Sequence, residues 1–254
     1  MASKENILKI ANAIGLLVTL SVNAAANIIP LNGVTTGELS DIYGNLFTPA
    51  GYVFSIWSVI YLLLGAFIFY QFSVKDEDLH EKIGWYFVIS CFFNSIWIFF
   101  WHYYYVALSV IAMFGLLGSL IQIYTKLGIG QAEIPPKKRY MVHTTFSVYL
   151  GWITVAPIAN VAALLVDIGW NAYNTTAIYI TSAMILIALV LTLINTYIRG
   201  DIAYAAVLVW ALGGIVQKQL NTMLIPWVAG LSIVIIILVL IVKKTGVLSS
   251  SMPL

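Results

Sequence analysis

Charged side chains are scarce in this sequence. Asp, Glu, Lys and Arg make up 9% of its 254 residues, whereas soluble domains carry about 25%. Hydrophobic residues make up 61%, which is more than a soluble core of this size can bury. The composition therefore indicates an integral membrane protein.

The chain also lacks the residues that most membrane pumps and enzymes use. No Asp, Glu, Lys or Arg falls near the middle of a long apolar run, although ion-coupled transporters and proton pumps usually keep such groups there. The sequence contains no phosphate-binding loop, no His-Glu-x-x-His pair and no nucleophile elbow. Its single cysteine, Cys91, excludes an intramolecular disulfide.

Long apolar runs are what the sequence has instead. Each is about 20 residues long, which is typical of a membrane-spanning helix and not of the ten-residue alternating strands of an outer-membrane barrel. The first run follows Lys4 and Lys9 as a signal peptide would, but we expect it to be retained. Short connections predict one all-α bundle of about eight helices, at residues 8–30, 49–72, 83–101, 104–125, 140–166, 176–198, 202–218 and 224–242.

The distribution of basic residues predicts the orientation. If both termini are cytoplasmic, Lys218 is the one basic residue left outside, which is a strong positive-inside signal. This predicts an integral protein of the cell (cytoplasmic) membrane. The residues then placed inside are Lys4, Lys9, Lys75, Lys82, Lys126, Lys137, Lys138, Arg139, Arg199, Lys243 and Lys244.

The start of the second helix carries the most distinctive pattern. Thr48 followed by Pro49 predicts a helix start, because a threonine hydroxyl can cap a free N–H and proline fits the first turn. Four residues then recur every three or four positions, so we expect them to share an inward face. They are Phe54, Trp57, Tyr61 and Gly65.

The third helix has a second aromatic row. Asn94, Trp97 and Trp101 are spaced for one helix face. The helix ends in the aromatic stretch 101–105, which predicts a ring belt at the membrane boundary, with His102 at the interface.

Three further features allow two interpretations each. Residues 32–47 form either a cover over a cavity or an ordinary solvated loop. Polar residues along the first helix (Asn12, Thr19, Asn23 and Asn27) indicate interhelical hydrogen bonds more than ligand binding. His143 is interpreted as a hydrogen-bonded packing residue more than as a titrating one.

The aromatic and amide residues of the inner faces suggest a binding surface. Stacking on flat rings together with a few hydrogen bonds would hold a large, flat apolar ligand. Equally, the rings could simply fill the interior of the bundle.

Three sequence blocks occur in a recognisable order. They are Phe47-Thr-Pro-Ala-Gly-Tyr-Val-Phe54 with Trp57, Tyr61 and Gly65; Asn94-Ser-Ile-Trp97; and Tyr149-Leu-Gly-Trp-Ile-Thr-Val-Ala156 with Asn160. In order and spacing they resemble the TspO/MBR family, the tryptophan-rich sensory or translocator-protein-like proteins. The resemblance covers residues 8–166, the five-helix core of that family.

The resemblance implies a pocket closed by the loop between helices one and two. In the family this pocket binds porphyrins, haem-related tetrapyrroles and, in some members, sterols. It implies no covalent cofactor and, as partners, a hydrophobic small molecule and the bilayer but no nucleic acid. By position, the implied ligand-binding residues are Pro49, Tyr52, Phe54, Trp57, Asn94, Trp97, Trp152, Ala156 and Asn160.

The chain departs from the family pattern at several positions. Ala50 and Tyr52 replace the usual proline and tryptophan, and the gap between Phe54 and Trp57 is one residue shorter. Ile158 replaces a tyrosine, and Leu165 an arginine, of the family's cholesterol motif, so sterol binding by that route is not implied.

The last three helices make this a long form of the family. We expect a five-helix core at residues 1–170 and a three-helix extension at 171–254, which would cover the surface that short members use to dimerise. The expected role is a sensor, carrier or scavenger of a flat hydrophobic ligand. The alternatives are a small-solute transporter, or a photoenzyme that degrades a tetrapyrrole through Trp57 and Trp152.

Overall fold

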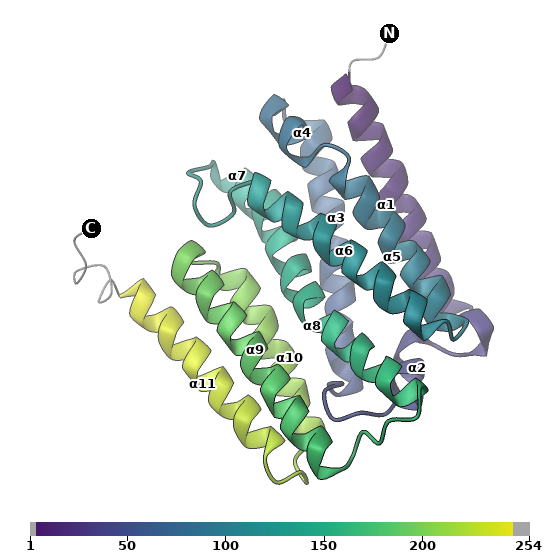
Figure 1. Ribbon diagram of the computed structural model, residues 1–254. Coiled ribbons are helices and arrows are strands. Elements are labelled where there is room, and N and C mark those ends of the chain that lie inside the picture. The colour runs from purple at the N-terminus through teal and green to yellow at the C-terminus, as the bar shows by residue number, and fades with distance from the viewer. Residues whose placement is uncertain (1–3, 246–254) are drawn as a thin grey trace.

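The computed structural model describes residues 4–245, which are helical with no strand in that range (Figure 1). Six helical segments are long and apolar enough to cross a membrane, while α5 and α10 are shorter at 17 residues each. The all-α membrane bundle of about eight helices is thereby confirmed. These helices are α1 (Lys4–Ile28), α3 (Ile56–Ser73), α5 (Tyr86–His102), α6 (Val106–Lys126), α8 (Thr144–Asp167), α9 (Thr175–Arg199), α10 (Ile202–Lys218) and α11 (Ile225–Lys244).

Short helical elements connect the long helices. A reciprocal cap holds the start of α2, because Glu38 N donates to Thr35 Oγ1 at 3.3 Å and Thr35 N donates to Glu38 Oε2 at 2.7 Å. The short elements are η1 (Leu31–Gly33), α2 (Thr36–Ile42), η2 (Gly51–Ser55), α4 (Glu77–Ile83), α7 (Pro136–Lys138) and η3 (Arg139–His143).

Interhelical hydrogen bonds position α1. Asn12 Nδ2 donates to Gln71 Oε1 on α3 at 3.1 Å, and Asn23 Nδ2 donates to Asn94 Oδ1 on α5 at 2.8 Å. Such bonds join helices in lipid, where hydrophobic burial gives no driving force between them. The packing interpretation is therefore confirmed for Asn12 and Asn23, whereas Asn27 Nδ2 bonds within α1, to the carbonyl of Asn23 at 2.9 Å.

The start of the second long helix differs from the prediction. Thr48 does not cap it, because Thr48 N and Oγ1 are both bonded to the side chain of Asn45 at 2.9 Å. Helical structure begins at Gly51 as the tight 3₁₀ turn η2, and α3 follows at Ile56. Gly65 is exposed, and a Cβ at this position would have no neighbouring atom within 4 Å, so its placement on an inward face was wrong.

The three C-terminal helices lie on the side of α8 opposite α1 (Figure 1). One of them, α10, is bonded to η2 and to the residue before it, since Ala50 N donates to the carbonyl of Gly214 at 3.2 Å and Trp210 Nε1 donates to that of Val53 at 3.1 Å. A Cβ on Gly214 would overlap Val53. The extension therefore contacts the segment that leads into α3. The division at residue 170 stays a prediction.

Candidate functional site

A cluster of aromatic rings fills the half of the bundle next to α2. Trp57 on α3 lies 6.0 Å from Trp97 on α5 and 6.2 Å from Trp152 on α8, measured between ring centroids. Phe54 of η2 meets the edge of Trp152 at 5.9 Å. Trp97 stacks on Trp101, one turn further along α5, at 6.4 Å. Three helices thus each contribute indole rings to one place.

A small cavity lies among these rings, and we call it the tryptophan cavity. Its volume is about 40 Å³, and no charged side chain is among its lining residues within the described part of the chain. The lining consists of Thr36, Ser40, Pro49, Phe54, Trp57, Trp97, Trp101, Met113, Trp152, Val155, Ala156, Ala159 and Asn160.

A second cavity adjoins the first on the side of α1, and we call it the side cavity. It has a volume of about 240 Å³ and shares Thr36, Phe54, Trp57 and Trp97 with the tryptophan cavity. Its remaining lining residues are Asn23, Asn27, Gly37, Ser58, Tyr61 and Ile98. The indole of Trp57 therefore lines both cavities, which lie side by side along the aromatic face of α3.

The segment between α1 and α3 covers both cavities. Thr36 and Ser40 of α2 reach the lining, and hydrogen bonds with the end of α5 hold the segment in place. Asn32 Nδ2 donates to the carbonyl of His102 at 3.0 Å, and the ring of His102 is bonded to Thr36 Oγ1 and the carbonyl of Leu31, both at 3.0 Å. Of the two interpretations of residues 32–47, the geometry is that of a cover.

His102 and Trp101 differ from their predicted placement at the membrane boundary. His102 is fully buried and Trp101 is 5% exposed. Trp101 Nε1 lies 3.5 Å from the carbonyl of Thr36, and its ring packs on Tyr43 at 5.5 Å. The belt prediction was wrong for these two residues because the cover lies over the end of α5 and shields it from the surroundings.

Most polar groups in this region have partners. Trp97 Nε1 donates to Asn160 Oδ1 at 2.8 Å, and Asn160 Nδ2 donates to Ser109 Oγ at 2.8 Å. Two buried polar atoms are exceptions: Trp152 Nε1 and Tyr61 OH have no hydrogen-bond partner among the described residues. A buried polar atom without a partner costs about 1–3 kcal/mol. These two groups are available to a ligand without displacing any existing bond.

The predicted site residues divide into two groups. Seven of them line the tryptophan cavity, while Tyr52 and Asn94 do not. Tyr52 is 46% exposed and packs edge-on against Trp210 at 5.3 Å, because the 3₁₀ turn η2 rotates its side chains differently from an α-helix. Asn94 is buried behind the cavity, where its Nδ2 donates to Tyr149 OH at 3.0 Å.

Some lining residues were missed by the sequence prediction. Thr36 and Ser40 come from the cover, and Met113 comes from α6, which no family block includes. Trp101 was placed on the same helix face as Trp97, four residues away, but was assigned to the membrane boundary and not to the site. The residues of the cover carry no comparable signal, since their position depends on the hydrogen bonds with α5.

Local contacts shift the pKa values of one carboxyl group and one phenol group on the cover. Hydrogen bonds from the Thr35 backbone and hydroxyl lower the pKa of Glu38, so it stays ionised at the start of α2. Burial, and then the charge of Asp167, raise the pKa of Tyr43. Neither group lines a cavity. The described residues include no group of three His, Cys, Asp or Glu placed to hold a metal ion.

Comparison with known proteins gives one result. A family model described as TSPO-like protein matches residues 9–242, which include all three C-terminal helices. No curated protein and no solved structure matches the chain. The matched region is longer than the stretch 8–166 that carries the three sequence blocks.

Proposed function

Because the chain belongs to the TSPO-like protein family, we propose that it binds a flat hydrophobic ligand in the tryptophan cavity. The proposed ligand is a porphyrin or haem-like tetrapyrrole, or a related lipid, and the proposed role is that of a sensor, carrier or scavenger. The observation that carries this proposal is the buried Trp152 Nε1, an unused donor in an aromatic and uncharged wall.

The orientation of the indoles favours a flat ligand. Trp57 and Trp97 are inclined by 27°, and Trp97 and Trp101 by 19°, so the three rings form a nearly parallel stack. Aromatic surfaces attract other flat rings by offset stacking, and a few polar groups then fix the ligand's orientation. Trp152 Nε1 and Tyr61 OH would supply those polar groups, one from each cavity.

The present cavities are smaller than such a ligand. Their volumes of about 40 and 240 Å³ compare with roughly 300–1,000 Å³ for sites that enclose drug-sized molecules. Binding a tetrapyrrole therefore requires the cover, or the rings of Phe54 and Trp57, to move. We expect the cover to move and not the rings, because the bonds of Thr36, Asn32 and Leu31 with His102 can open without unfolding a long helix.

A porphyrin titration tests this proposal. Full-length protein purified in detergent would be titrated with protoporphyrin IX, and binding would be followed by the porphyrin's own absorbance, so that replacing a tryptophan leaves the reporter unchanged. Trp152→Phe keeps an aromatic ring but removes the N–H. We expect saturable binding that Trp152→Phe weakens roughly two- to tenfold, the value of one hydrogen bond.

Trp227→Phe is the matched control, because Trp227 is 71% exposed on α11 and lines neither cavity. It should leave the affinity unchanged. Absence of saturable binding, or equal weakening by both variants, would refute the site. Progressive loss of porphyrin absorbance in light, with no loss in the dark, would identify the degrading enzyme instead of a simple binding protein.

A further inference from the structure

A polar crevice lies at the other end of the bundle, where α9 turns into α10. Its volume is about 580 Å³ and it shares no lining residue with the tryptophan cavity or the side cavity. Three segments distant in sequence form its walls: the loop at 129–134, the helical turn η3 with the start of α8, and the residues 199–206. Gly130 permits this approach, because a Cβ there would overlap the carbonyl of Arg199.

Two guanidinium groups line the crevice. Arg199 Nη1 donates to the carbonyl of Ile129 at 2.9 Å, and its guanidinium lies 5.0 Å from the ring centre of Tyr124. These contacts fix the side chain and use only one of its five N–H groups. Arg139 lies across the crevice, and its guanidinium has no partner among the side chains that the structure describes. Both residues therefore keep donors for a ligand.

Asp201, the single carboxylate among the described lining residues, already accepts hydrogen bonds from other groups of the chain. Asp201 Oδ2 accepts from Tyr124 OH at 2.7 Å, and Asp201 Oδ1 accepts from the backbone N of Tyr204 at 3.1 Å, which caps α10. Two arginines against one bonded aspartate leave the lining with a net positive charge. Such a lining favours an anion.

His143 adds an unused polar atom to the same wall. It is 6% exposed, and its Nε2 has no hydrogen-bond partner among the described residues. His143 is therefore buried, as expected of a packing histidine, but the hydrogen bond expected of it is absent at Nε2. His143 ends the π-helical turn η3, and π-helical turns are frequent at functional sites.

We propose that this crevice binds a phosphate group, held by Arg139, Arg199 and His143. Guanidinium groups bind phosphate through paired N–H donors, which makes arginine the usual residue for this anion. The rim supports a phosphate carried on a lipid, because Tyr140 and Ile202 are exposed apolar side chains beside the arginines. Basic pockets between membrane helices on the cytoplasmic side bind phospholipid head groups in the same way.

Binding of defined phosphate compounds to the full-length protein tests the proposal. The probes are short-chain phosphatidylglycerol, counted on the protein by native mass spectrometry, and inorganic phosphate, titrated by calorimetry. We expect saturable binding of the lipid that inorganic phosphate reduces by competition. If inorganic phosphate binds and the lipid does not, the phosphate site stands and its source is a soluble phosphate compound.

Arg139→Gln is the diagnostic variant, because its guanidinium has no intrachain partner that folding would lose. It should weaken binding roughly tenfold or more, since hydrogen bonds to charged groups are the strong ones. Lys137→Gln removes the same charge two residues away, on an exposed side chain that does not line the crevice, and should change affinity less than about threefold. Equal losses in both variants, or no saturable binding of either probe, would overturn the proposal.

Discussion

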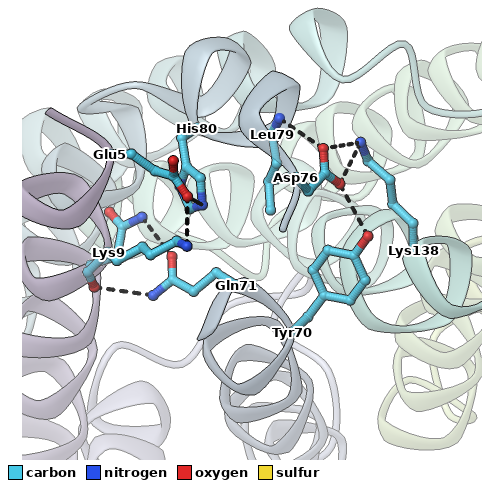
Figure 2. A network of polar contacts seen from close by, with 9 residues as sticks. Glu5, Lys9, Tyr70, Gln71, Asp76, Leu79, His80 and Lys138 are labelled. Carbon is cyan, nitrogen blue, oxygen red and sulfur yellow. Dashed lines mark hydrogen bonds and ion pairs between the residues drawn. The ribbon is translucent and has the colours of Figure 1, made fainter. Parts of the chain in front are cut away.

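The Asp76 cluster beside α4 and the two cavities beside α2 treat buried polar groups in opposite ways. At the end near α4, the carboxylate of Asp76 is enclosed by partners, as Figure 2 shows. Lys138 Nζ lies 2.8 Å from Asp76 Oδ2, Tyr70 OH donates to the same oxygen at 3.0 Å, and Leu79 N donates to Oδ1 at 3.2 Å. At the α2 end, by contrast, Trp152 Nε1 and Tyr61 OH are buried with no partner in the described chain.

The comparison separates structural from ligand-binding polar groups. The bonds of Asp76 join α3, α4 and α7, so they hold the bundle together without help from any other molecule. The free atoms at the α2 end make no hydrogen bond among the described residues and so lower the stability of the fold as it stands. We infer that the bonded Asp76 cluster maintains the fold and that the two free atoms beside the tryptophan and side cavities mark where a ligand binds. Four changes test this distinction, from the largest expected effect to the smallest.

Breaking the Asp76 cluster should have the largest effect. Asp76→Asn leaves the buried Lys138 with only the exposed Asp78, whose Oδ2 lies 3.7 Å away. Removing the close partner of a buried ion pair typically costs about 3–5 kcal/mol. Thermal unfolding in detergent, followed by circular dichroism, would measure the loss. Asp78→Asn is the control, because Asp78 is 57% exposed and lies 3.0 Å from Lys82 but only at 3.7 Å from Lys138. It should cost less than about 1 kcal/mol. Similar losses of stability in both variants would show that the Asp76 cluster has no special structural role.

Disturbing the contact between the extension and η2 should cause the next largest loss of stability. Gly214→Ala places a Cβ against Val53 and within 3.1 Å of Pro49 Cβ, and such overpacking costs about 1–3 kcal/mol. Because Pro49 lines the tryptophan cavity, porphyrin affinity should fall as well. The neighbouring change Gly213→Ala meets no atom within 4 Å. If that control weakened binding equally, the effect would belong to α10 itself and not to its contact with η2.

Two tyrosine changes sharpen the comparison within one region. Tyr149→Phe removes the hydroxyl that accepts from Asn94 Nδ2 at 3.0 Å, and should lower the free energy of unfolding by about 1 kcal/mol. Tyr61→Phe removes a hydroxyl without a partner among the described residues, so stability should stay the same or rise while porphyrin affinity falls. Destabilisation by Tyr61→Phe comparable to that by Tyr149→Phe would show that its hydroxyl already serves the fold.

The dependence of stability on pH should be the smallest effect. Burial, and then the charge of Lys9, lower the pKa of His80 on α4, while Glu5 and Asp76 oppose that shift. The folded protein therefore binds fewer protons at His80 than the unfolded chain does. Its contribution to stability is complete above the ordinary value of 6.5 and is lost as the pH falls through the lowered folded pKa.

Unfolding midpoints measured between pH 7 and pH 5 would show this effect as a decrease on acidification. His80→Gln should reduce that decrease. Asp76 does not titrate in this interval. Burial raises its pKa, but Lys138 together with the hydrogen bonds of Tyr70 and Leu79 holds that pKa below the ordinary 3.8. An unchanged pH dependence in His80→Gln would exclude His80 as the titrating group.

The sequence predicted features that depend on local periodicity. Run lengths located the eight helices within a few residues, and the spacing of Phe54 and Trp57 placed both on the lining of one cavity. Thr48 was misassigned because Asn45 competes for its backbone and hydroxyl. Tyr52 lies outside the tryptophan cavity because a 3₁₀ turn replaces the first turn of the expected α-helix.

Features that depend on distant contacts could not be predicted in the same way. His102 lies at the end of an apolar helix, and only its hydrogen bonds with the cover explain its burial. The phosphate crevice combines Arg139 and Arg199, which are 60 residues apart. Their proximity follows from the close approach at Gly130, and neither arginine is distinguished from other basic residues at the helix ends by its neighbours in the chain.

The bond from Ala50 N to the carbonyl of Gly214 has a consequence for any shortened chain. If translation stopped after α8, Ala50 N would lose its partner in α10, and the carbonyl of Val53 would keep only its bond from Ile56 N. An unpaired backbone group in hydrocarbon, where no water replaces the partner, costs several kcal/mol. The first five long helices alone would then need a second protein chain, or a rearranged η2, before the wall holding Trp57 could form.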